Sequence, residues 1–128
     1  MENFVKIIIG MIFLFISSST LASIPTCHSS NGGYCQYTGK VEKIYVNAKS
    51  LILIYFDSAV PLDLPASVGI NVTNGGAASF KIDANPEFAK LLYSTALEAQ
   101  ASGREVTIQM SSVNSGYLQI DNIWLSAP

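Results

Sequence analysis

The sequence is poor in the residues that build most catalytic and metal sites. It contains one histidine, His28, two cysteines, Cys27 and Cys35, and one tryptophan. A structural zinc site needs about four ligands, more than these residues supply. Nucleophilic catalysis needs a histidine base that a third group orients, and no serine elbow motif accompanies His28. The sequence therefore predicts neither a catalytic function of this kind nor a bound metal or cofactor.

Charged residues are also scarce, and no basic cluster is present. Asp, Glu, Lys and Arg make up 12% of the chain, and the formal net charge is −2. Because proteins bind nucleic acid largely through Lys and Arg on the phosphates, we expect no nucleic-acid partner. The carboxylates are scattered, and no spacing singles out two of them as a catalytic pair.

The chain has no apolar run that reaches the roughly twenty residues of a membrane-spanning helix. The apolar run from Ile7 to Ile16 has only ten residues, and Lys6 precedes it. Small residues at Thr20 and Ala22 suit cleavage before Ser23. We therefore predict that residues 1–22 are a secretory signal peptide and that the mature chain is secreted or periplasmic, without a stable membrane anchor.

The two cysteines that are present lie close together, after the predicted signal peptide. In an exported protein such a pair most simply forms a disulfide, here Cys27 with Cys35. Glycine, serine and asparagine between them favour the turn that this closure requires. The sequence thus predicts an N-terminal disulfide loop over residues 23–38, followed by a single domain over residues 39–128.

One segment, residues 85–102, has the pattern of an amphipathic helix. Asn85 suits the N-cap, Pro86 the first helical position and Gly103 the C-terminal stop. One apolar stripe contains Phe88, Leu91, Leu92, Thr95, Ala96 and Ala99. Ala89, Tyr93 and Leu97 extend it around the helix. Since a small sheet covers only one stripe, we predict that these three residues contact another subunit.

Alternating and continuous apolar runs predict strands on both sides of this helix, in a mostly β protein. The predicted strands lie at 39–46, 51–56, 68–72, 79–82, 105–110 and 117–125, where 68–72 and 79–82 either pair as a hairpin or form one interrupted strand. This order favours an OB-fold, a five-stranded Greek-key barrel with the helix between strands 3 and 4. The alternative is an open α+β sheet with the helix on one face.

Two tyrosines flank the second cysteine and offer a candidate binding site. Aromatic faces beside hydroxyl groups suit a sugar, so Tyr34, Tyr37 and Thr38 are the predicted carbohydrate-binding residues. The alternative is that the tyrosines pack the disulfide loop against the barrel.

Three segments, residues 39–47, 87–97 and 99–108, together resemble the subtilase cytotoxin B-subunit family. The resemblance implies an OB-fold that assembles as a ring pentamer, with helices lining a central pore, glycans bound at the outer faces and a toxin A subunit as partner. Tyr37 and Thr38 fall roughly where the sugar-binding stretch of that family begins. The chain departs from the family in lacking a second cysteine pair and in its loops at 57–66 and 111–116.

The residues and the resemblance together predict a secreted bacterial binding module that forms a homo-oligomer and binds cell-surface glycans. The alternative is a stand-alone protein-binding domain, such as an inhibitor or an envelope factor, that binds no glycan.

Overall fold

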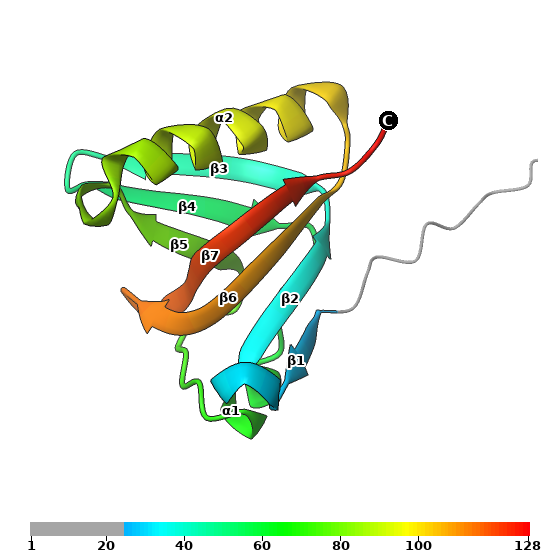
Figure 1. Ribbon diagram of the computed structural model, residues 1–128, viewed down its shortest axis with the longest axis vertical. Coiled ribbons are helices and arrows are strands. Elements are labelled where there is room, and N and C mark those ends of the chain that lie inside the picture. Colours follow the sequence, from blue (N-terminus) through cyan, green and yellow to red (C-terminus); the bar gives the residue numbers. More distant parts are fainter. Residues whose placement is uncertain (1–24) are drawn as a thin grey trace, which may run out of the picture.

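Seven strands form one mixed sheet, and one long helix packs across its end, in the computed structural model, which describes residues 25–128 (Figure 1). The strands are β1 (Thr26–His28), β2 (Tyr34–Gly39), β3 (Val41–Asn47), β4 (Leu51–Phe56), β5 (Ala77–Lys81), β6 (Val106–Asn114) and β7 (Tyr117–Leu125). The helices are α1 (Asp63–Ser67) and α2 (Pro86–Ser102), with the 3-10 turns η1 (Ser30–Gly32) and η2 (Ile82–Ala84). The predicted signal peptide lies outside the described residues.

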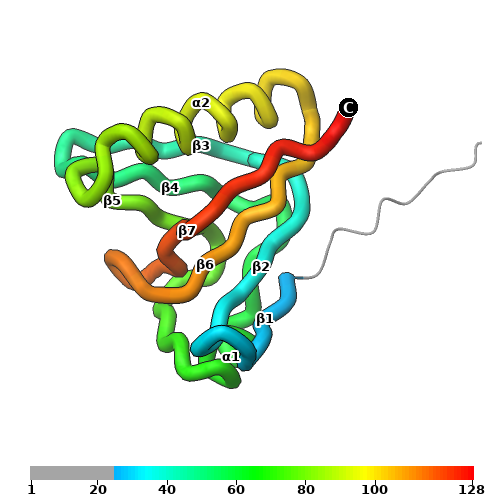
Figure 2. The backbone as a smooth tube through the Cα atoms, in the orientation of Figure 1, coloured from blue at the N-terminus to red at the C-terminus, as the bar shows by residue number. Residues whose placement is uncertain are grey.

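The strands follow the order β1-β2-β6-β7-β5-β4-β3. Every neighbouring pair is antiparallel except β5 and β7, which are parallel. The mostly β architecture with a long helix is therefore confirmed. The sheet is not closed, and it has seven strands where five were predicted. The two additional strands are β1 and β2, because most of the segment predicted as a disulfide loop, residues 23–38, forms two strands that pair with each other. Figure 2 shows β1 and β2 side by side.

The long helix begins and ends where the sequence predicts. The side chain of Asn85 accepts a hydrogen bond from the backbone N–H of Phe88 at 3.1 Å. Pro86 is the first helical residue, and Gly103 ends the helix in the left-handed conformation with φ 68°. Glycine adopts this conformation without the steric cost that a Cβ would add. Both ends of α2 are thus fixed by local chemistry.

Residues 68–72 correct the sequence prediction, because they form no strand. The backbone N–H of Val68 and that of Ile70 both donate to the carbonyl of Pro65, so the chain coils onto α1 after Ser67. Ile70 and Val72 are nevertheless buried. Their period-two apolar pattern therefore reflects burial of a loop against the core rather than pairing in the sheet.

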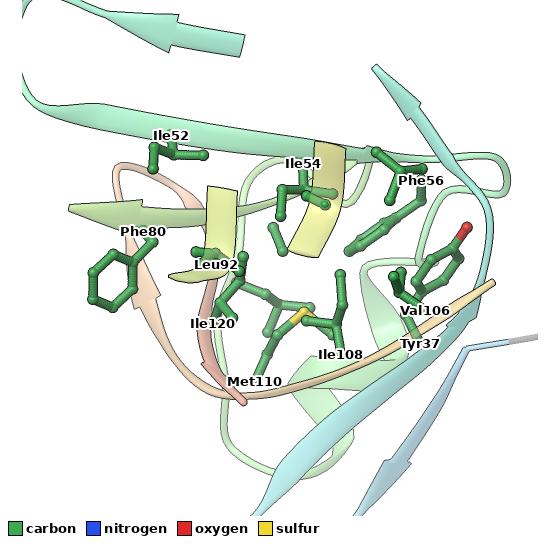
Figure 3. Close-up of a cluster of buried hydrophobic side chains, with 14 of the residues drawn as sticks. Tyr37, Ile52, Ile54, Phe56, Phe80, Leu92, Val106, Ile108, Met110 and Ile120 are labelled. Carbon is green, nitrogen blue, oxygen red and sulfur yellow. The ribbon is translucent and has the colours of Figure 1, made fainter. Parts of the chain in front are cut away.

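The core lies between two parts of the sheet, one made of β2, β6 and β7 and the other of β3, β4 and β5, and beneath α2 (Figure 3). Ile52, Ile54 and Phe56 enter it from β4, and Val106, Ile108 and Met110 enter it from β6. Leu92 descends from α2 into the same cluster and is fully buried. These alternating positions leave the intervening residues of β4 and β6 on the outward face of the sheet.

The predicted disulfide between Cys27 and Cys35 is confirmed. The two residues are direct partners in the antiparallel pair of β1 and β2, so the bridge ties the edge strand to its neighbour. Closing a loop of this size contributes about 2–3 kcal/mol in the chain-entropy account. Within residues 25–128, no helix combines the length and apolarity that crossing a bilayer requires.

Candidate functional site

The three predicted sugar-binding residues all lie on β2, but they do not share a face. Tyr34 and Thr38 point outward and are partly exposed, whereas Tyr37 points into the core and is fully buried. Tyr34 lies beside the ring of His28, with the ring centroids 5.0 Å apart. Four strand positions separate Tyr34 from Thr38, about 13 Å. The structure therefore does not bring the three side chains together.

The buried Tyr37 holds the corner between β2 and β3. Its hydroxyl lies 2.6 Å from Oδ1 of Asp57 and 2.7 Å from the carbonyl oxygen of Lys40, and it shares its one proton between these acceptors. It also accepts the backbone N–H of Asp57 at 3.1 Å. Burial, and then the hydrogen bond to Asp57, raise the pKa of Tyr37 well above its usual value, so the hydroxyl stays protonated.

Gly39 makes room for this corner. A Cβ at Gly39 would lie 2.5 Å from the hydroxyl oxygen of Tyr37 and 2.9 Å from Oδ1 of Asp57, so any larger residue would push these groups apart. The ring of Tyr37 also packs against Phe56, with centroids 4.2 Å apart. In this position the Tyr37 ring is fully buried, which favours the alternative that this tyrosine packs the N-terminal segment against the sheet.

The predicted oligomer contacts on α2 divide between the core and the surface. Ala89 is buried in the core, whereas 40% of Tyr93 and 44% of Leu97 are exposed. Leu91, predicted to face the core, is 68% exposed. The buried stripe of α2 is narrower than the apolar stripe that the sequence predicts. It consists of Ala89, Leu92, Ala96 and Ala99. The small residues in this stripe let the helix approach the sheet closely, which leaves the larger side chains at its edges.

An apolar groove with a volume of about 350 Å³ runs beside the N-terminal half of α2. We call it the α2 groove. Its lining residues are Val46, Ile52, Ile82, Pro86, Ala89, Lys90 and Tyr93. The sequence identified Ala89 and Tyr93, but it gave no signal that Val46 of β3 and Ile82 of η2 would lie opposite them. These contacts depend on how α2 crosses the sheet, which no local pattern encodes.

A second group of side chains gathers on the outward face of the sheet. We call it the tyrosine face, and it consists of Tyr45, Tyr55, Tyr117 and Lys43. In the strand register Lys43 lies opposite Tyr55, and Tyr45 lies opposite Leu53. Nζ of Lys43 lies 4.3 Å from the centroid of the Tyr55 ring, within the range of a cation–π contact.

Small residues on β5, which lies between β4 and β7, let tyrosines from these two strands approach one another. Ala77 of β5 is the register partner of Tyr55, and the parallel ladder to β7 places Tyr117 on its other side. Burial and then the neighbouring Tyr55 hydroxyl raise the pKa of Tyr117. Nδ2 of Asn74 lies within 3.5 Å of the Tyr117 hydroxyl. The alternation of side chains along each strand predicts that these tyrosines point outward. That they are neighbours depends on the strand order, which the alternation does not predict.

Acidic and metal-binding side chains do not converge elsewhere in the described chain. Among residues 25–128, no three His, Cys, Asp or Glu side chains are arranged to hold a metal ion. Asp57 belongs to the corner held by Tyr37, and Asp121 accepts a hydrogen bond of 2.5 Å from the Ser111 hydroxyl. The candidate sites in this part of the chain are the α2 groove and the tyrosine face.

The chain matches no family model, no curated protein and no solved structure.

Proposed function

We propose that this chain is a secreted binding module that associates with copies of itself through the α2 groove and binds cell-surface glycans. The observation that carries self-association is the apolar groove lined in part by the half-exposed Tyr93, with the half-exposed Leu97 one helical turn further along α2. This function agrees with the resemblance to the subtilase cytotoxin B-subunit family, which also suggests a ring pentamer and a toxin A subunit as partner.

The same proposal includes an OB-type interpretation of the sheet. If β2 and β3 are counted as one bent strand, its two halves pair with β6 and β4 respectively. The bent strand, β4, β5, β7 and β6 then follow one another in a circuit, with α2 between β5 and β6. The parallel contact between β5 and β7 joins the two halves of that circuit. These pairings support a Greek-key barrel of the OB type.

Self-association follows from the cost of leaving apolar side chains in water. Exposed apolar area costs about 25 cal/mol for each Å² that a partner could cover. Tyr93 of α2 and Val46 of β3 line the groove, and Val46 is 50% exposed. Leu97 lies one helical turn beyond Tyr93 on α2. A second copy that covers this continuous surface removes all three side chains from water.

The solution mass of the mature chain tests this part of the proposal. We expect light scattering to give a multiple of the single-chain mass, and we expect Leu97→Glu to reduce it to one chain, because the new carboxylate would be buried without a partner. Leu91→Glu is the matched control. Leu91 is more exposed than Leu97 and lies on the other side of the helix, so its variant should keep the wild-type mass. A wild-type monomer at high concentration, or equal dissociation of both variants, would contradict the proposal.

Glycan binding has its own test. We expect the labelled mature chain to bind a subset of glycans on an array that carries sialylated and neutral structures. Silence across the whole array, from protein whose fold is verified, would contradict this part of the proposal.

The second candidate function is a stand-alone protein-binding domain. The observation that favours it is the outer edge of β3, which within residues 25–128 pairs with β4 on one side and with no second strand, although Gln100 of α2 donates to its Glu42 carbonyl. An unpaired strand edge can accept a strand from a partner protein. A silent array combined with a monomeric mass would favour this function over the first.

A further inference from the structure

We propose that the tyrosine face binds a pyranose ring that carries a carboxylate. This inference rests on the proposed function, because it assigns a specific site and a ligand class to glycan binding. The site lies on different strands from residues 34–38, where the sequence prediction placed it.

The arrangement of the tyrosines suits a sugar ring. Tyr45 is 44% exposed, and the Tyr55 and Tyr117 rings are half-buried around the buried side chains of Leu53 and Ala77. The three rings therefore stand on an apolar floor rather than extending freely into solvent. Aromatic rings fixed in this way provide apolar surface for the C–H groups of a pyranose and hydroxyls for its polar edge, with little loss of side-chain entropy.

Charge complementarity selects an acidic sugar rather than a neutral one. Lys43 is held over Tyr55, and within residues 25–128 the one ion pair joins Lys90 to Glu87, so no carboxylate pairs with Lys43. The carboxylates nearest in the strands are Glu42, which precedes Lys43, and Asp57, two positions beyond Tyr55, and neither forms an ion pair with Lys43. On β7, Asp121 lies four strand positions beyond Tyr117, about 13 Å away. A ligand carboxylate beside Lys43 would complete an ion pair that the protein leaves open.

The tyrosine face is shallow, so one copy should bind a sugar weakly, and self-association would compensate by joining several such faces. A single pyranose on an open surface buries little area, so we expect a dissociation constant on the order of 1 mM for a monosaccharide. Several copies joined through the α2 groove would present several such faces to one cell surface. Linked sites of this kind can raise the overall affinity by a factor of about 10²–10⁴ without any new contact.

The test is an NMR titration of the mature chain with glucuronic acid as the probe, and with glucose and acetate as controls. We expect glucuronic acid to move the backbone amide signals of residues 43–45, 55 and 117. Tyr45→Ser should weaken binding about tenfold, and Tyr45→Phe should retain most of it because the ring remains. Lys43→Gln should abolish the preference for glucuronic acid over glucose. Tyr34→Ser is the matched control and should leave binding unchanged.

Each contrary outcome overturns a definite part of the reasoning. If acetate moves the same signals as strongly as glucuronic acid, the face holds an adventitious ion only and the inference fails. If glycans on the array bind wild type, Tyr45→Ser and Lys43→Gln equally well, the inference fails while the proposed function stands. If wild type binds no glycan on the array, the proposed function itself fails. Loss of array binding in Tyr34→Ser alone would return the site to residues 34–38.

Discussion

Leu92→Ala is expected to lower the free energy of unfolding by about 2–5 kcal/mol, enough to unfold a marginally stable domain. Leu92 is fully buried where α2 meets the sheet, in contact with the core cluster that β4 and β6 complete (Figure 3). Truncation would remove apolar contacts from the centre of the molecule. The close packing of α2 on the sheet leaves little freedom for neighbours to fill the space, so we expect a cost toward the upper end of the range.

The matched control is the adjacent residue of the same type. Leu91 is 68% exposed, so Leu91→Ala should change the free energy of unfolding by less than about 0.5 kcal/mol. Urea unfolding of both variants, followed by circular dichroism, measures the difference. Similar losses in the two variants would mean that the helix is rotated relative to this structure or that Leu91 is covered in an oligomer. Repeating the measurement with Leu97→Glu, the proposed monomeric variant, separates these two causes.

The contrast between Leu91 and Leu92 shows where prediction from the sequence stops. The caps at Asn85 and Gly103 are local, and the structure agrees with them. The rotation of the helix about its axis is not local, because α2 is apolar over most of its circumference. Which leucine is buried depends on how closely Ala89, Ala96 and Ala99 allow the helix to approach the sheet. That choice is made by tertiary packing, and the sequence pattern alone does not determine it.

The same limit of sequence-based prediction applies to the candidate sites. Tyr37 was predicted with Tyr34 and Thr38 because all three are near Cys35, yet strand alternation puts Tyr37 on the opposite face. The sequence pattern predicts a disulfide loop and no strand at residues 34–38, so strand alternation gives no information on which way these side chains point. The tyrosine face depends on β5 lying between β4 and β7, and the parallel contact that places it there joins segments far apart in the chain. Local periodicity predicts which way a side chain points once its strand is known, but it does not predict the neighbours across the sheet.

Tyr37→Phe is expected to lower the free energy of unfolding by about 1–3 kcal/mol at pH 7, because the hydroxyl links the Asp57 carboxylate to the Lys40 carbonyl. The aromatic ring is kept, so the packing against Phe56 should survive and the loss should reflect hydrogen bonding alone. Tyr34→Phe removes a hydroxyl from a half-exposed ring on the same strand. It should cost less than about 0.5 kcal/mol.

The pH dependence of the stability difference between wild type and Tyr37→Phe is a more specific test than the size of that difference at pH 7. In the unfolded chain Tyr37 should titrate near its ordinary pKa of about 10, whereas in the folded protein its pKa is raised and the hydroxyl stays protonated. Below pH 10 both states hold the proton, so the stabilisation is complete. Above pH 10 the unfolded state loses the proton first, and the stabilisation should fall by about 1.4 kcal/mol per pH unit. Urea unfolding of wild type and Tyr37→Phe at pH 7, 10.5 and 11.5 should therefore show the difference shrinking, and a difference that stays constant would mean that Tyr37 is accessible to solvent.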